Sequence, residues 1–212
     1  MKAMKFMVTT MVLLLMICGP AMADVLDTSD ITATGTYNGN LSFITDGEFP
    51  SEGGLWMDGT VYWFGPPFDP NNHVNFTFDY GSLYTIEDVV LSVDNNRDIY
   101  LVEYSSDGST WNELFTKHEH DGDQWVLGGM DTLSTISEDE EYVAAIDFNP
   151  VIARYLRFSA SETQWDGAHS IGEFQVYGSA APVPEPTTLV LSGLGLLGLA
   201  GFLRRQKKAR LQ

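Results

Sequence analysis

The sequence predicts an all-β protein whose central domain is an antiparallel β-sandwich of the jelly-roll type, between an N-terminal signal peptide and a C-terminal transmembrane helix. Short runs rich in aromatic and β-branched residues recur through residues 24–181, Gly- and Asp-rich turns separate them, and no helical periodicity interrupts them. Many short strands with turn-rich connections are typical of sandwiches and jelly rolls. The chain therefore divides into segments 1–23, 24–181 and 182–212.

The expected strands follow from local pattern. Alternating apolar and polar residues indicate strands with one buried face, and they occur in VNFTF at 74–78 and GEFQVY at 172–177. Short aromatic and β-branched runs indicate the other strands, at 89–93, 100–104, 142–146 and 155–158. Turn signals separate these runs, at Tyr80-Gly81, Asp94-Asn95-Asn96, Asp107-Gly108 and Asn149-Pro150.

The N-terminus has the three parts of a secretory signal peptide. Two lysines precede the apolar run 11–17, and Ala21 and Ala23 supply small residues at positions −3 and −1 of a cleavage site. We expect cleavage after Ala23. The single cysteine, Cys18, lies inside this signal. The mature chain therefore has no thiol, which excludes a disulfide scaffold, thiol catalysis and Cys-ligated zinc.

The C-terminus also has three parts. A proline-fixed VPEP stretch at 183–186 cannot be helical, an uncharged Gly-containing run covers 189–203, and five basic residues follow between Arg204 and Arg210. The apolar run is at the lower limit of what spans a bilayer, and the basic end favours a cytoplasmic C-terminus. A single-pass anchor would share the last two parts but would not require the VPEP stretch.

All three parts, in this order, resemble the PEP-CTERM sorting signal of Gram-negative bacteria. The resemblance implies that an exosortase recognises the Pro-Glu-Pro region and removes the tail beyond the inner membrane. The protein would then pass through an inner-membrane intermediate to the cell surface or extracellular matrix. The residues of this expected recognition segment are Val183, Pro184, Glu185 and Pro186.

The central domain is strongly acidic. Residues 24–181 contain 28 Asp and Glu against four Lys and Arg, a net charge of −24. Such a charge argues against nucleic acid and anionic membrane surfaces as partners, and it favours cations and neutral ligands. We expect solubility in the cell envelope to account for most of it. Disorder does not, because aromatic and β-branched residues are too frequent.

A second resemblance rests on three motifs in the expected order. YLVEYSSDGSTW at 100–111, ARYLRF at 153–158 and SIGEFQVYG at 170–178 resemble motifs of the F5/8 type C (discoidin) domains. The resemblance spans most of residues 31–178 and implies a galactose-binding-like jelly roll, a fold used chiefly to bind sugars, lipids or proteins. In the first motif, Val102 and Tyr104 would face one side, Asp107-Gly108 would make the turn, and Trp111 would cover the edge of the core.

The same resemblance implies a structural Ca²⁺ site. TDGEFPS at 45–51 is similar to the family's calcium loop, and Gly172-Glu173 is similar to the closing pair of the last strand. Asp46 and Glu173 would provide carboxylates, and Ser51 its hydroxyl or carbonyl. Backbone carbonyls would come from Phe43, Glu48 and Gly172. An all-oxygen set of this size suits Ca²⁺. The alternative is an Asp-Gly turn and an unrelated surface Glu.

Other metal and catalytic patterns are weak. The acids at 94–98 have EF-hand spacing, but Ile99 stands where glycine is required. The HEHD run at 118–121 has two histidines that are more often solvated than metal-bound. The sequence contains no G-x-S-x-G or H-E-x-x-H motif. We therefore expect no enzymatic activity.

Ligand recognition in such a fold is expected in loops at one end of the sandwich, where aromatic faces stack on sugar rings. The candidates are Trp56, Trp63, His73, Trp125, Trp165 and Asp166, although half or more of such residues commonly cap the core. We expect an exported, glycan-binding protein of the surface or biofilm matrix. A structural matrix protein that uses the jelly roll for protein contacts is the alternative, and a carbohydrate-active enzyme is third.

Overall fold

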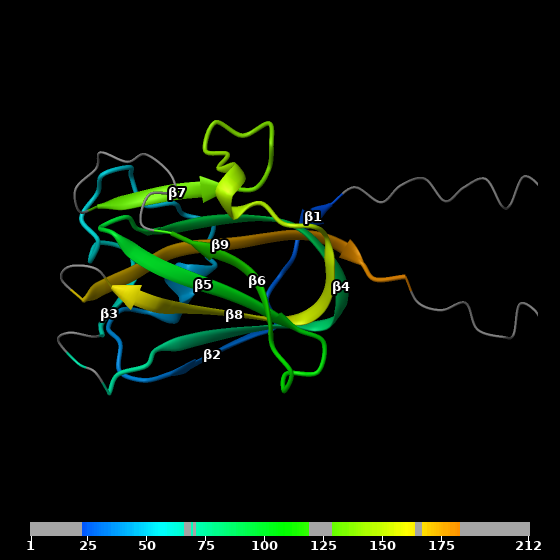
Figure 1. Ribbon diagram of the computed structural model, residues 1–212, viewed down its shortest axis with the longest axis horizontal. Coiled ribbons are helices and arrows are strands. Elements are labelled where there is room, and N and C mark those ends of the chain that lie inside the picture. Colours follow the sequence, from blue (N-terminus) through cyan, green and yellow to red (C-terminus); the bar gives the residue numbers. More distant parts are fainter. Residues whose placement is uncertain (1–22, 66–68, 70, 119–128, 164–166, 183–212) are drawn as a thin grey trace, which may run out of the picture. The chain divides into compact units, whose positions relative to one another are not determined.

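The computed structural model describes residues 23–65, 69, 71–118, 129–163 and 167–182 (Figure 1). These residues form nine β-strands and two short 3₁₀ helices, so the expectation of an all-β domain is confirmed. In chain order the elements are β1 (Asp24–Val25), β2 (Asp30–Thr34), η1 (Leu41–Ile44), β3 (Val61–Phe64), β4 (Asn75–Asp94), β5 (Asp98–Ser105), β6 (Asn112–Lys117), β7 (Met130–Ser134), η2 (Ala144–Ile146), β8 (Val151–Thr163) and β9 (Ala168–Ala180).

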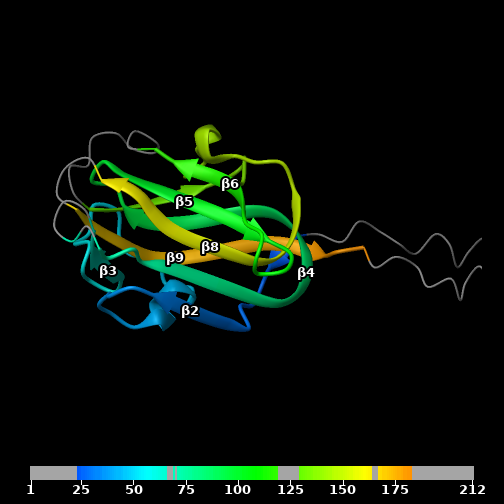
Figure 2. The same cartoon turned by 60° about the horizontal axis from the view of Figure 1, so that its bottom comes forward.

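The long strand β4 connects the two layers of the domain. Its first half pairs with β2 and β8, and its second half pairs with β7 and β9, all antiparallel. Between the halves the register shifts from Asp79 to Tyr84, and Gly81 adopts a φ of 75° there. The expected turn at Tyr80-Gly81 is therefore a bend within one strand, which Figures 1 and 2 show curving at one end of the domain.

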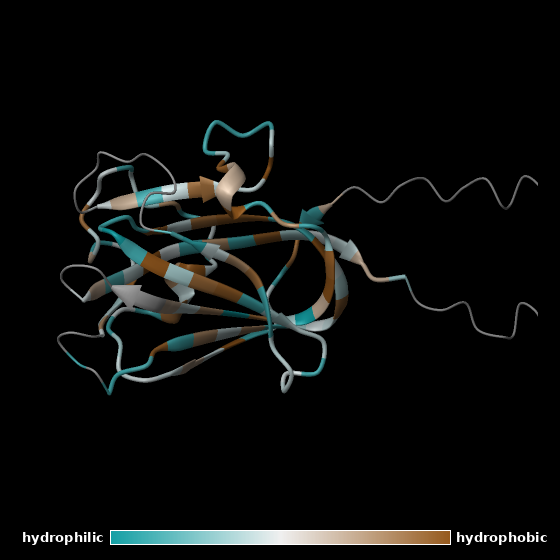
Figure 3. Cartoon of the chain, in the orientation of Figure 1, coloured by the Kyte–Doolittle hydropathy of each residue, from teal (hydrophilic) through white to brown (hydrophobic). Residues whose placement is uncertain are grey.

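The core lies between these two layers and is rich in aromatic rings. Phe78 of β4 and Phe174 of β9 have ring centroids 4.8 Å apart, and Phe158 of β8 lies 6.4 Å from Phe174. Hydropathy alternates along β5 and the first half of β4, so one face of these strands is apolar (Figure 3). Among the described residues, the core side chains come from the segment between Leu26 and Val176. Since Met1–Ala181 forms one compact unit, we expect residues 24–181 to fold as an isolated domain.

The SSDGSTW stretch is a structural turn, as expected. The Oδ1 of Asp107 accepts hydrogen bonds from the backbone N–H groups of Ser109 and Thr110, both at 2.8 Å. Gly108 has a φ of 72°, a conformation that glycine adopts without strain. In total, the side-chain oxygens of Ser105 and Asp107 accept four hydrogen bonds from backbone N–H groups, and these bonds stabilise the turn between β5 and β6.

Two local expectations are wrong. Residues 142–146 do not form a strand: Tyr142 makes one isolated bridge to Ser134, and η2 then carries Ile146 into the core as a 3₁₀ turn. The run is apolar because Ile146 is buried, and a buried 3₁₀ turn has the same short apolar pattern as a strand. Trp111 does not cover the core either, because its ring lies 4.2 Å from the Arg157 guanidinium, which also contacts Glu103 on the outer face.

Asp79 and Arg154 form a two-pronged ion pair across β4 and β8, with both N–O distances at 2.8 Å. Hydrogen bonds from Arg154 hold the pKa of the Asp79 carboxyl below its usual range. Since the pKa is lowered in the folded state, the pair stabilises the fold above the ordinary Asp pKa, and this contribution is lost as the pH falls through the lowered value.

We therefore expect Asp79→Asn to lower the free energy of unfolding at neutral pH, with a difference from wild type that shrinks below about pH 4. Urea unfolding at several pH values measures this. Asp30→Asn is the matched control, because Asp30 is the exposed residue that faces Asp79 on β2. An equal loss for Asp79→Asn at neutral and acidic pH would contradict the role of its charge.

In the part of the chain that the structure describes, no helix is both long and apolar enough to cross a membrane. The expected signal peptide, apart from Ala23, and the expected sorting helix lie outside the described residues. So does the whole recognition segment from Val183 to Pro186.

Candidate functional site

The strand ends at one end of the sandwich, on the left in Figure 1, bring together distant parts of the sequence. We call this the loop end: it comprises the described connections 71–74 and 95–97 and the strand ends beside them, Phe64, Lys117, Met130, Thr163 and Ala168. The register places Phe64 beside Ala168, and Asp94 beside Met130. His73 is exposed in the first of these connections, whereas Trp125, Trp165 and Asp166 lie outside the described residues.

Trp63 lies in the core and not on the surface. Its side chain is 1% exposed and packs edge-on against Phe76 and Phe158, with centroid distances of 5.3 and 6.4 Å. The ring of His169 stacks on it at 5.5 Å. The structure thus removes Trp63 from the residues that can stack on a sugar, because β3 alternates and Trp63 belongs to its inward face together with Val61.

The outward face of β3 carries an aromatic surface. Trp56 is half-buried and meets Tyr62 and Phe64 edge-to-face, with ring centroids 5.2 and 5.9 Å away. Phe64 is 42% exposed. Leu55 and Met57, on either side of Trp56, are also exposed, at 61% and 44%. We call Trp56, Tyr62 and Phe64 the aromatic platform. Of the three, only Trp56 is identifiable as a candidate from the sequence.

The platform is held by backbone pairing on both sides of β3. One edge of β3 pairs with β9, and on the other side Asn38 exchanges two backbone hydrogen bonds with Tyr62, at 2.8 and 3.0 Å. The side-chain amide of Asn72 donates to the carbonyl of Phe64 at 2.9 Å and to that of Thr36 at 2.8 Å. The rings therefore project from a fixed strand.

The expected calcium loop lies against the expected closing pair. Glu173 is 1% exposed, and its Oε2 accepts a hydrogen bond of 3.2 Å from the backbone N–H of Gly47. Burial raises the pKa of Glu173 to about 7, and the charge of Asp46 adds to this rise. A Cβ on Gly172 would lie 2.4 Å from Pro50, so only glycine allows this close contact between loop and strand.

Four of the expected oxygen donors line one groove with a volume of about 490 Å³: Phe43, Asp46, Glu48 and Ser51. Asp46 also borders a second hollow together with Glu173. The carboxylates of Asp46 and Glu173 and the backbone carbonyls of the loop form an all-oxygen donor set that fits a hard cation such as Ca²⁺.

Beneath the loop end lies a buried polar network. Lys117 is fully buried and donates to the side-chain carbonyl of Asn95 at 2.6 Å, and the amide of Asn95 donates to Asp131 at 2.6 Å. Asp94 accepts a hydrogen bond from the backbone N–H of Gly129 at 3.1 Å. The 94–98 turn is therefore anchored inside the domain. Such a network fixes the strand ends from which the loops emerge.

The fold and sequence match a known family. The family model of the F5/8 type C domain matches residues 30–174. The chain belongs to the F5/8 type C domain family. A second family model, the PEP-CTERM protein-sorting motif, matches residues 182–206. Both resemblances seen in the sequence are thus confirmed, and the sorting motif implies an exported, cell-surface protein.

The first of three similar solved structures shows the same fold for this F5/8 type C domain. Truncated AlyQ with CBM32 and alginate lyase domains is 18% identical with a TM-score of 0.50; the match covers 79% of this chain and 37% of that one. The CBM32 of AlyQ in complex with 4,5-unsaturated mannuronic acid is 19% identical (TM-score 0.46; 72% and 97% covered). CpGH89CBM32-6 of Clostridium perfringens is 16% identical (TM-score 0.42; 74% and 100% covered). No curated protein matches the sequence.

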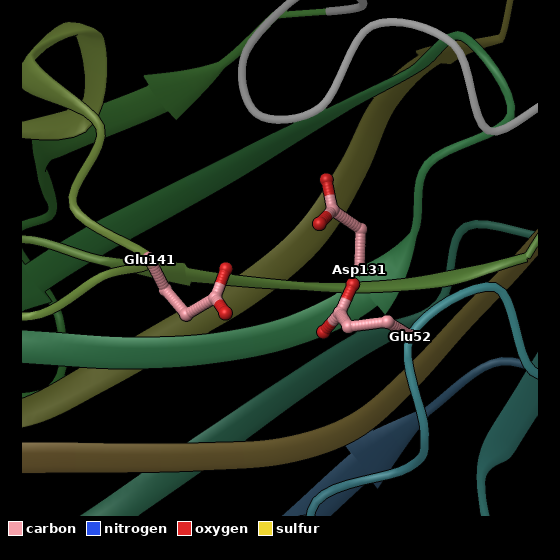
Figure 4. Close-up of side chains that lie close together, drawn as sticks. All are labelled: Glu52, Asp131 and Glu141. Carbon is pink, nitrogen blue, oxygen red and sulfur yellow. The ribbon is translucent and has the colours of Figure 1, made fainter.

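The F5/8 type C domain also contains an acidic cluster that the sequence does not reveal. Carboxylate oxygens of Glu52, Asp131 and Glu141 lie within 4.8 Å of one another, and Figure 4 shows that they come from three separate segments. Glu52 accepts a hydrogen bond from the backbone N–H of Thr132 at 3.0 Å. Glu52 thus serves as an acceptor along the outer edge of β7. Sequence spacing gives no signal for this cluster, because its members are far apart in the chain.

Proposed function

We propose that this F5/8 type C domain is an exported, non-catalytic glycan-binding module that acts at the cell surface or in an exopolysaccharide matrix. The observation that carries the proposal is the aromatic platform on β3, beside the loop end. Aromatic faces that are fixed and partly exposed provide stacking area at low entropic cost. The exposed rings and aliphatic neighbours form an apolar surface that has no role in the core.

We further propose that Ca²⁺ is bound between the 43–51 loop and the start of β9. Asp46 and Glu173 would provide carboxylates, Ser51 its hydroxyl or carbonyl, and Phe43, Glu48 and Gly172 backbone carbonyls. The buried carboxyl of Glu173 and the close packing of Gly172 against Pro50 support this assignment. The ion would be structural, because it would join the loop that follows η1 to the last strand of the domain.

A glycan array probed with the soluble domain 24–181 tests the proposed function. We expect binding to a limited set of glycans, with Trp56→Ala reducing the signal and the exposed Ile152→Ala on β8 leaving it unchanged. DNA and anionic vesicles are expected to remain unbound without divalent cations, given the charge of −24. Binding to other matrix proteins but to no glycan would favour the structural alternative, and turnover of chromogenic glycosides or esters would favour an enzyme.

The sorting motif predicts a processed mature chain. We expect an exosortase to cut near the Pro-Glu-Pro region, so that protein from the native envelope ends close to Pro186. Intact-mass spectrometry of that protein measures this directly. A chain with both prolines changed, Pro184→Ala and Pro186→Ala, is expected to keep its tail. Wild-type protein that still carries residues 204–212 in most molecules would contradict the processing.

A further inference from the structure

We propose that the groove between the 43–51 loop and the 54–59 turn is a second sugar-binding site, which takes a neutral, hydroxyl-rich segment of a glycan. We call it the acidic groove. The inference rests on the proposed glycan-binding function and adds a site that is separate from the aromatic platform. It follows from the apolar walls of the groove, from its carboxylates and from the backbone contacts that fix its two sides.

The walls of the acidic groove offer apolar surface to a ligand. The groove has a volume of about 490 Å³, and four apolar residues line it, Phe43, Phe49, Pro50 and Leu55. That volume is in the range of small-molecule sites. Phe49 is 40% exposed and Leu55 is 61% exposed, so both side chains remain accessible. The C–H face of a pyranose ring can therefore pack against them.

The carboxylates of the acidic groove are hydrogen-bond acceptors. Glu48 and Asp58 line the groove together with Asp46 and Ser51. Asp46 and Ser51 are the expected calcium ligands, whereas the side chains of Glu48 and Asp58 have no role in that site. An ionised carboxylate only accepts hydrogen bonds, and those that it accepts from hydroxyl groups are charge-assisted. The groove thus suits a ligand that donates, as the hydroxyls of a sugar do.

Backbone hydrogen bonds fix both sides of the acidic groove. The loop on one side contacts the start of β9, as described above. On the other side, Gly53 donates to the carbonyl of Met130 at 2.8 Å, and Met130 donates to that of Gly54 at 3.1 Å. The following turn is closed by the N–H of Asp58, which donates to the carbonyl of Leu55 at 2.9 Å. A groove that is fixed in this way loses little conformational entropy upon binding.

Charge selects a neutral ligand over an anionic one. Among the described residues, no Lys, Arg or His lines the acidic groove. The described basic residues have other positions: Arg97 in the 95–97 connection of the loop end, Arg154 and Arg157 in ion pairs on β8, and Lys117 in the interior. The net charge of −24 already counts all four. A uronate in the groove would meet like charges, whereas sugar hydroxyls would meet acceptors.

Isothermal titration of the calcium-loaded domain 24–181, once cooperative unfolding shows that it is folded, tests the inference. The probes are neutral hexasaccharides of glucose, galactose and mannose, an oligouronate and a glucosamine oligomer of equal length, each at low and high salt. We expect at least one neutral probe to bind with little salt dependence, and the oligouronate to bind at least about tenfold more weakly. Tighter, salt-sensitive binding of the glucosamine oligomer, or equal binding of the oligouronate, would overturn the inference while leaving glycan binding intact.

Variants separate the acidic groove from the aromatic platform. Glu48→Ala and Asp58→Ala are each expected to weaken binding of the neutral hexasaccharide by about tenfold, as for lost hydrogen bonds to charged acceptors. The matched control is Glu140→Ala, which removes an exposed acid between β7 and η2 and is expected to change the affinity by less than about twofold. Since Glu48 would give Ca²⁺ only its backbone carbonyl, its variant is expected to keep the response to chelator.

The outcomes distinguish the two sites. Unchanged binding in both groove variants together with weaker binding by Trp56→Ala would assign the glycan to the platform alone and would overturn the inference. An equal loss in the Glu140→Ala control would also overturn it, because the effect would then come from overall charge. Absence of binding to every probe would refute the proposed function itself.

Discussion

Removing Ca²⁺ from the metal-loaded domain is expected to lower its melting temperature by about 5–10 °C. A ligand at a hundredfold excess over its Kd stabilises the folded state by about 2.7 kcal/mol, and a domain of this size shifts by a few degrees per kcal/mol. The structural reason is the position of the expected ion between the 43–51 loop and Glu173, which is 1% exposed. Thermal unfolding followed by circular dichroism, with and without chelator, measures the change.

Three variants make the calcium prediction specific. Asp46→Ala and Glu173→Gln are expected to abolish the response to chelator, because each removes a carboxylate ligand. Glu48→Gln is expected to retain the response, since Glu48 would contribute only its backbone carbonyl. An unchanged melting curve upon chelation, for protein shown beforehand to contain metal, would end the calcium hypothesis.

Trp63→Ala is expected to reduce the free energy of unfolding by about 3–5 kcal/mol. The indole ring is 1% exposed and contacts Phe76, Phe158 and His169, so its removal leaves a cavity in a close-packed core. Urea unfolding of the domain 24–181 measures the loss. Trp56→Ala is the matched comparison, and we expect it to cost clearly less, because Trp56 is only half-buried. A loss below about 1 kcal/mol for Trp63→Ala would contradict its place in the core.

Much of the fold is predictable because its strands alternate or are rich in aromatic and β-branched residues. Apart from Val74, the expected strands 74–78, 89–93, 100–104, 155–158 and 172–177 lie within β4, β5, β8 or β9. The sequence does not predict that 74–78 and 89–93 belong to one bent strand, because Gly81 imitates an ordinary turn. Strands β2 and β7 are short and carry polar residues, so their pairing with β4 depends on tertiary contacts and not on local pattern.

The candidate site is less predictable, because exposure depends on which face of a strand a residue occupies. Trp63 and Phe64 are neighbours, yet one is in the core and the other is on the surface. The alternation VYWF would have assigned Tyr62 and Phe64 to one face, but the sequence does not state which face is outward. The loop and closing pair of the expected calcium site do lie together, with Gly47 donating to Glu173.

Retention on the native matrix is the most direct test of the account. The domain 24–181 and its Trp56→Ala variant would be mixed with extracellular polysaccharide isolated from the producing cells, and the bound fraction measured after sedimentation. The account predicts that the wild-type domain sediments with the polysaccharide, that a soluble glycan which it binds releases it, and that Trp56→Ala stays largely in solution. Wild-type protein that stays in solution, or equal retention of a folded Trp56→Ala variant, would contradict glycan binding by this surface.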